Sequence, residues 1–246
     1  MFPKLAAFDL EIAKTIPENA PSWDPYFPLG ITCAAVALEG EPEPIVWQGV
    51  PRMTQPEVSA MLDTLRELAG AGYTLLTWNG CKFDFHMLGL ESKRLEDAAA
   101  LAAEHVDLML MFTFRQGHFL GLEKALQGAG FQGKRKTVQL KNGELMHDMN
   151  GAKAPHLWAA GEYDAVLSYL RDDVLQPIHL ARQIETTHRI CWTSRSGALQ
   201  DVHFDRLYTV RESFRLPEPD TSWMRSPPSR ADFISWMPGG VLPKPE

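Results

Sequence analysis

The sequence predicts an α/β layered fold in which helices cover one mixed β-sheet. Short apolar runs of strand length alternate with stretches of helical periodicity, in the order strand, strand, strand, helix, strand and then mostly helix. The chain of 246 residues is 45% hydrophobic and 22% charged, as globular proteins are, which excludes disorder for its bulk. A chain of this length can build its core without disulfide or metal staples.

Four strands are expected before residue 80. Each is an apolar run bounded by residues that favour turns, as buried strands are. These runs are residues 4–10, 30–38, 44–49 and 73–78. The helix between the third and fourth strands begins at Thr54-Gln-Pro-Glu57, whose spacing is that of a capping box with an early proline.

Helical patterns dominate the chain from residue 83 to residue 188. Helices are expected at 83–90, 92–105, 120–127 and 162–188, the last with Pro177 inside it, whereas 106–114 is ambiguous between helix and strand. These elements and the strands define a first domain, residues 1–188.

A second part, residues 189–246, is expected to pack on that domain. It begins with a small β hairpin around a turn at 194–197, and seven of the last 31 residues are proline, which indicates an extended tail pinned by Trp223 and Trp236. By default this tail covers an apolar edge of the domain. Alternatively, it docks a protein partner, because proline-rich segments bind at a low entropy cost.

The composition indicates the cellular compartment in which the protein is expected. The longest apolar run, Ile31–Leu38, is far shorter than a membrane span, and the N-terminal residues do not form a signal peptide. The cysteines, Cys33, Cys81 and Cys191, are odd in number and show no CxxC spacing. The sequence therefore predicts a cytoplasmic protein without a cysteine-based zinc site.

The net charge and the local distribution of charge point in opposite directions on nucleic-acid binding. The net charge of −7 argues against a nucleic-acid binder, which usually has a basic field. Between Arg115 and Lys153, however, seven basic residues stand against three acidic ones, with a cluster at 134–136. That stretch is either a solvated loop or a local basic patch.

Two carboxylates end the first strand. Asp9 and Glu11 are two residues apart, so both side chains leave the same face of a sheet whose other residues are apolar. Like charges about 5 Å apart repel by roughly 3 kcal/mol at an effective dielectric constant near 20. A buried pair of this kind needs a cation.

Two further segments contribute acids. Asp84 follows the fourth strand and the turn at Gly80, and alone it would be an ordinary helix cap. Tyr169 and Asp173 are one helical turn apart on the long helix and share a face; singly they would be a core-edge ring and a surface charge. Together, four carboxylates make an oxygen-rich set that suits Mg²⁺ or Mn²⁺.

The order Asp-x-Glu, Asn-Gly-x-x-Phe-Asp and Tyr-x-x-x-Asp resembles the DEDD superfamily of 3′–5′ exonucleases, in the branch with tyrosine in the third motif. His105-Val-Asp107-Leu-Met and the segment 158–169 are similar to bacterial exonucleases related to the proofreading domain of family B DNA polymerases. The resemblance covers residues 4 to about 185 and implies a ribonuclease-H-like fold. Ile12, where threonine is common, and Pro177 depart from the pattern.

The resemblance implies a role for each acid. Asp9 would touch two metal ions, Glu11 and Asp173 would complete the site of the nucleophilic water, and Asp84 would lie on the leaving-group side. Tyr169 would orient that water rather than act as a free base, because phenol has a reference pKa near 10. The reaction would release nucleoside 5′-monophosphates from the 3′ end of a single strand, with DNA favoured.

Neighbouring side chains are candidates for substrate contacts. Three lie in the second motif and three in the basic cluster, where they would line the path of the strand. They are Asn79, Lys82, Phe83, Lys134, Arg135 and Lys136. Trp158, Phe131 and Phe119 are candidate stacking rings, although core burial is the favoured interpretation for each.

Two other functions stay open. A binding module without catalysis on the same fold would have lost a carboxylate of the set, and none is lost here. An endonuclease or transposase on this fold places a single aspartate on the first strand, where this chain has Asp9 and Glu11.

Overall fold

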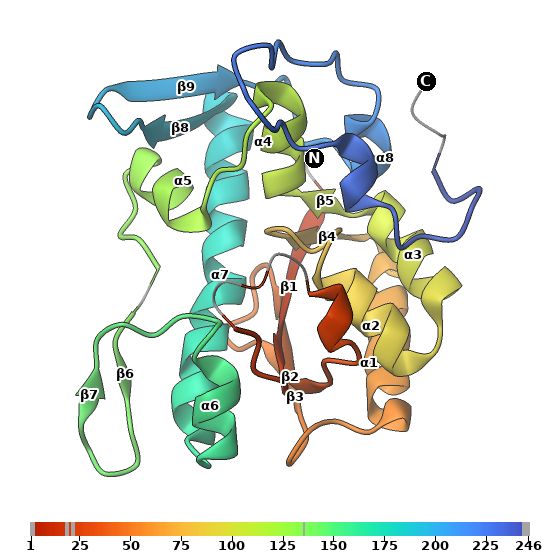
Figure 1. Cartoon of the computed structure of the whole chain (residues 1–246), viewed down its shortest axis with the longest axis vertical. Coiled ribbons are helices and arrows are strands. Elements are labelled where there is room, and N and C mark those ends of the chain that lie inside the picture. Colours follow the sequence, from red (N-terminus) through yellow and green to blue (C-terminus); the bar gives the residue numbers. More distant parts are fainter. Residues whose placement is uncertain (1–2, 18–19, 21–22, 135, 243–246) are drawn as a thin grey trace.

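The computed structural model describes residues 3–17, 20, 23–134 and 136–242. Its centre is a five-stranded sheet in the order β3-β2-β1-β4-β5 (Figure 1). The strands are β1 (Lys4–Ile12), β2 (Ile31–Leu38), β3 (Ile45–Gln48), β4 (Tyr73–Thr77) and β5 (Val106–Asp107). β1 pairs antiparallel with β2 and parallel with β4. The mixed sheet that the sequence predicts is confirmed, and the layout fits a ribonuclease-H-like fold.

Helices cover both faces of this sheet (Figure 1). They are α1 (Gln55–Gly70), α2 (Asp84–Ser92), α3 (Leu95–Glu104), α4 (Leu108–Gln116), α5 (Leu122–Gly128), α6 (Ala154–Ala159), α7 (Tyr163–Thr187) and α8 (Val210–Ser213). The capping box at the start of α1 is present, with the Glu57 carboxylate accepting the Thr54 amide at 2.7 Å. Among the described residues, no helix combines the length and the apolar character that crossing a membrane requires.

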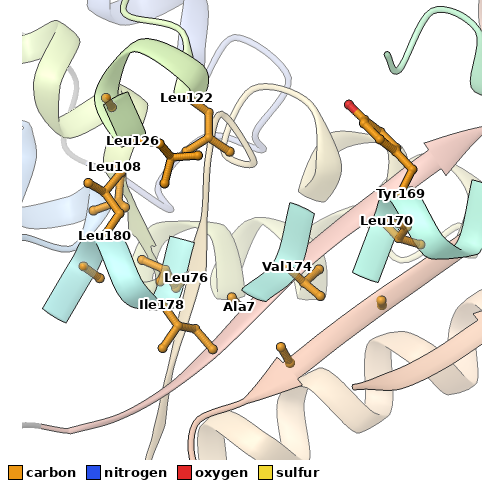
Figure 2. Packing of buried hydrophobic residues seen from close by; sticks show 14 of the residues in the cluster. Ala7, Leu76, Leu108, Leu122, Leu126, Tyr169, Leu170, Val174, Ile178 and Leu180 are labelled. Carbon is orange, nitrogen blue, oxygen red and sulfur yellow. The ribbon is translucent and has the colours of Figure 1, made fainter. Parts of the chain in front are cut away.

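The alternation of side chains along β1 decides what each face of the sheet meets. Phe8 and Leu10 pack in the core shared with α1, α2 and α3. Leu5 and Ala7 point the other way and pack under α7, whose residues Val174 and Ile178 lie beside Ala7 in Figure 2, with Leu170 one turn further along the helix. Because side chains two apart share a face, the next positions on the α7 side are occupied by the carboxylates of the first motif.

β4 is shorter than β1, and this leaves a gap in the sheet. The parallel pairing of the two strands runs from Lys4 opposite Tyr73 to Ala7 opposite Leu76, and β4 ends at Thr77. The second half of β1 therefore has no strand on that side. The loop after β4 and the first turn of α2 occupy the place instead.

Local signals resolve the ambiguous segments. Residues 106–114 contain both structures: β5 takes two residues, and α4 begins after Asp107, whose side chain caps it by accepting the amides of Met109 and Leu110. The C-terminal hairpin is confirmed as β8 (Arg189–Thr193) and β9 (Leu199–His203). A second hairpin, β6 (Val138–Gln139) with β7 (Leu145–Met146), lies in the basic stretch and was not expected.

The tail after residue 215 packs on the domain, but only one of its two expected anchors is buried. Trp236 is half-buried, and its Nε1 donates to the carbonyl of Cys81 at 2.8 Å. Trp223 is 68% exposed, so the prediction that it pins the tail is wrong. Its indole donates to the Asp220 carbonyl, three residues away in the same tail, and its contact with the domain is an edge-on approach to the His118 ring at 6.4 Å. Phe233 takes the core position instead and is fully buried.

Candidate metal centre

Three carboxylates from distant parts of the chain converge where β1 passes under α7. One carboxylate oxygen of each of Asp9, Glu11 and Asp173 lies within 4.8 Å of the others. Asp9 and Glu11 arrive there because β1 points alternate side chains at α7, and Asp173 arrives because it lies on the buried stripe of that helix. The described part of the chain thus holds an oxygen-only group that could bind a divalent cation.

Asp84 approaches Asp9 at the edge of β1 that β4 leaves open, outside the group of three acids whose oxygens lie within 4.8 Å of one another. It is the first residue of α2 and is 2% exposed, and its Oδ1 accepts the Leu10 amide at 3.1 Å. That amide is free to donate because β4 has already ended. The side chain also hydrogen-bonds to the Asp9 carboxyl group. Asp84 is therefore directed at the sheet rather than acting as an ordinary helix cap.

The crowding of these acids shifts their protonation. Burial raises the pKa of Asp9 to about 7, and the charge of Asp173 adds to the shift. Burial and then the Asp9 charge raise the pKa of Glu11, and the same two causes raise that of Asp84. Without a cation, the cluster is expected to hold protons near neutral pH. A divalent ion that replaces those protons relieves the same repulsion.

One lysine already supplies positive charge. Lys134 Nζ lies 2.7 Å from Asp173 Oδ2 and 2.9 Å from the Tyr169 hydroxyl, to which it donates. Burial lowers the pKa of Lys134, but Asp173 and Asp9 outweigh this and the net shift is upward. Burial and then the Asp173 charge raise the pKa of Tyr169 well above its ordinary value, so the phenol stays protonated and can donate a hydrogen bond.

The donor set fits a cation by a second criterion. Asp173 Oδ1 is buried and has no hydrogen-bond partner among the described residues, and the same holds for Asn79 Oδ1. Buried oxygens without partners are costly, so such atoms in a native site call for an ion or ordered water. Oxygen ligands without sulfur or imidazole favour Mg²⁺ or Mn²⁺ over zinc.

Asp9, Glu11 and Asp173 form one wall of an open cleft of about 460 Å³, whereas Asp84 does not line it. Asn79, Phe83 and Lys134 line it as well, so three of the six candidate substrate residues reach the same space as the acids. Residues that carry no sequence signal add to the lining. Among them are the loop residues Trp23, whose ring meets that of Phe83 edge-on at 4.7 Å, Gly151 and Ala152, and also Pro155 at the start of α6.

Two other candidate substrate residues point elsewhere. Lys82 Nζ lies 5.7 Å from the centre of the Phe233 ring and does not line the cleft. Lys136 pairs with Glu123 at 2.7 Å and is half exposed. Arg135 falls outside the described residues. The basic cluster therefore sends Lys134 into the cleft, while Lys136 is committed to a surface ion pair.

Of the three candidate stacking rings, one is buried and two are exposed. Trp158 is 3% exposed and belongs to the core, as predicted, and its indole donates to the Gly49 carbonyl. For Phe131 and Phe119, which are 37% and 51% exposed, the expectation of core burial is wrong. Both follow the glycines that end short helices, and loop positions of this kind carry no periodicity from which burial can be derived.

Behind the cleft, Asp107 and His105 hold the loop after β4. Asp107 accepts the amides of Asn79 and Cys81, each at 2.9 Å. His105 bonds the Thr77 hydroxyl at 2.9 Å through Nε2, and its Nδ1 lies 2.7 Å from the Ala102 carbonyl. These contacts tie the end of β4 and the loop after it to the segment between α3 and α4.

Comparison with known proteins gives the fold. No family model and no curated protein matches the sequence. Among solved structures, the family B DNA polymerase from the hyperthermophilic archaeon Pyrobaculum calidifontis matches with a TM-score of 0.55 at 16% sequence identity. The match covers 75% of this chain and 25% of that one, so the chain corresponds to about a quarter of the polymerase. At this identity the likeness is one of fold.

Proposed function

We propose that this protein is a metal-dependent 3′–5′ exonuclease of the DEDD superfamily, tyrosine branch, acting on single-stranded or frayed ends. The observation that carries the proposal is the convergence of the first and third motifs, Asp9, Glu11 and Asp173, with Tyr169 beside them in one cleft. The fold likeness to a family B DNA polymerase agrees with the motif resemblance, which points to exonucleases related to the proofreading domain of that family.

Asp9, Glu11, Asp84 and Asp173 would hold two ions, Mg²⁺ or Mn²⁺. Ions of this kind, when bound, make hydroxide available near neutral pH and stabilise the leaving oxygen of a phosphodiester. Asp9 hydrogen-bonds to Asp84 and also lies within 4.8 Å of Glu11 and Asp173, so it would be shared by both ions. Glu11 and Asp173 would complete the site of the nucleophilic water.

Tyr169 and Lys134 act on the reacting groups without becoming bases. The Tyr169 phenol remains protonated and hydrogen-bonds to the Asp173 carboxylate, so it can orient a water beside that group. Lys134 carries a fixed positive charge into the same space and can contact a phosphate. Asn79 and Phe83, from the loop after β4, would receive the sugar and base of the terminal nucleotide.

The substrate proposed is single-stranded nucleic acid with a free 3′ end, DNA favoured. Incubation of the protein with 5′-labelled single-stranded DNA or RNA tests this, in Mn²⁺, Mg²⁺ or chelator, with products resolved on a gel. Shortening one nucleotide at a time from the 3′ end, with metal only, is expected. Asp9→Asn and Asp173→Asn should abolish it, whereas Glu67→Gln, which changes an exposed carboxylate on α1, should not. Full activity of either aspartate variant refutes the proposal.

A further inference from the structure

The tail reaches back to the loop that carries the second motif. Trp236 Nε1 donates to the Cys81 carbonyl at 2.8 Å, and its ring stacks on His86, with centroids 5.1 Å apart and planes 14° from parallel. Cys81 lies within the Asn79–Asp84 motif, and His86 lies one turn into α2. A residue 155 positions away from Cys81 in the chain thus touches both the motif loop and the first turn of α2.

Phe233 fixes the same loop from the side. It is fully buried in a cluster with Cys81, Leu110 and Phe114. Lys82 Nζ lies over its ring at 5.7 Å, which explains why that side chain turns away from the cleft. The neighbouring Arg230 guanidinium donates to the carbonyls of Phe114, Leu216 and Pro217, so the tail is itself fastened to the end of α4.

The loop contains an uncommon backbone conformation. Asn79 has a φ of 73°, in the left-handed region, which asparagine adopts more readily than other residues with a side chain but still uncommonly. A conformation of this kind persists only where its surroundings determine it. Asp107 constrains the loop from the inner side by accepting two of its amides. The bond from Trp236 to the Cys81 carbonyl is the corresponding constraint from the outer side.

We propose that Trp236 is a positioning residue for the candidate metal centre, and that it acts by holding residues 79–83 against the sheet. The loop then presents Asn79 and Phe83 to the cleft and starts α2 with Asp84 beside β1. The effect of this positioning on catalysis rests on the proposed function. The positioning itself, in which the loop is held between Asp107 and the tail, does not.

Trp236→Phe tests the clamp, because it keeps an aromatic ring for His86 and removes the indole donor. Trp223→Phe is the matched control: its Nε1 also donates to a backbone carbonyl, at 3.1 Å, but that carbonyl belongs to the tail. Hydrogen exchange of the peptide covering residues 78–86, followed by mass spectrometry of the full-length protein, reads the loop directly. We expect exchange about fivefold faster in Trp236→Phe, the size expected for one lost hydrogen bond, and unchanged in Trp223→Phe.

Kinetics on a 5′-labelled single strand in saturating Mn²⁺ separates positioning from mere stability. Because Asn79 and Phe83 line the cleft and Trp236 does not, Trp236→Phe should raise KM about fivefold while the melting temperature stays within a few degrees of wild type. Unchanged exchange at 78–86 overturns the inference, and so does a lowered melting temperature with KM unaltered. Absence of cleavage by the wild type would refute the nuclease assignment, whereas exchange alone decides whether Trp236 holds the loop.

Discussion

Replacing Asp9 by asparagine should make the metal-free protein more stable while removing its response to metal. The folded pKa of Asp9 is about 7 against an ordinary 3.8, so its ionised form is disfavoured in the folded state. The resulting penalty begins as the pH rises above about 4 and is complete above pH 7. At about 1.4 kcal/mol per pKa unit, it reaches about 4 kcal/mol.

The repulsion between neighbouring carboxylates gives an electrostatic penalty of similar size. Two charges 4.8 Å apart, the span of the carboxylate oxygens, repel by about 3 kcal/mol at an effective dielectric constant of 20. Asp9 is only half-buried, so solvent screening reduces the effect, and about 2 kcal/mol is the working figure. For a chain of this size that corresponds to about 4–8 °C in melting temperature.

Thermal denaturation at pH 8 and pH 5, in chelator and then in millimolar Mn²⁺, measures both effects. In chelator, Asp9→Asn should melt above wild type at pH 8, with less than half of that difference left at pH 5. Mn²⁺ should raise the melting temperature of wild type but not of the variant, because a ligand of the native state alone stabilises it. A variant that melts lower than wild type at pH 8 in chelator, or that responds equally to Mn²⁺, would refute the electrostatic reasoning.

Four other substitutions have expected outcomes. Tyr169→Phe should lower kcat at least tenfold with KM little changed, since the phenol is assigned to orienting water; an unaltered kcat contradicts that role. Lys134→Met should lower stability in chelator at pH 8 by about 1–3 kcal/mol, because Asp173 loses its buried counter-charge, and should enlarge the thermal shift with Mn²⁺. Burial lowers the pKa of His105 to about 3, below its ordinary 6.5, so this residue costs stability as the pH falls from 6.5 towards 3. Between pH 7 and 4.5, the free energy of unfolding measured in urea should therefore fall by about 2–3 kcal/mol less in His105→Gln than in wild type. Leu170→Ala, in the core under α7, should cost about 2–4 kcal/mol in the same assay, and a loss below 1 kcal/mol would contradict its burial.

The central sheet was predictable because burial on both faces leaves an unbroken apolar run. β1, β2 and β4 lie within a few residues of their expected bounds, and the alternation in β1 alone places Asp9 and Glu11 on one face. The i to i+4 spacing likewise places Tyr169 and Asp173 together on α7. Periodicity therefore predicts which acids share a face wherever they lie on regular elements.

Residues on loops escaped prediction for the opposite reason. Lys82 and Phe83 are neighbours in sequence, yet one lies over Phe233 and the other lines the cleft, and no periodic rule separates them. The strands of the β6–β7 hairpin have two residues each, too few to show alternation. Trp223 and Trp236 look alike in the sequence, and only the tertiary path of the tail distinguishes an exposed ring from an anchor.

The early end of β4 makes the length of one strand a determinant of chemistry. Two more residues of parallel pairing would bring a backbone carbonyl to the Leu10 amide and satisfy it, and the Asp84 carboxylate would have nowhere to bond. A sheet with longer, fully matched strands would have more ladder hydrogen bonds. It would also exclude Asp84, the acid that hydrogen-bonds to Asp9 at this edge. In this chain, lengthening the ladder and keeping the site are alternatives.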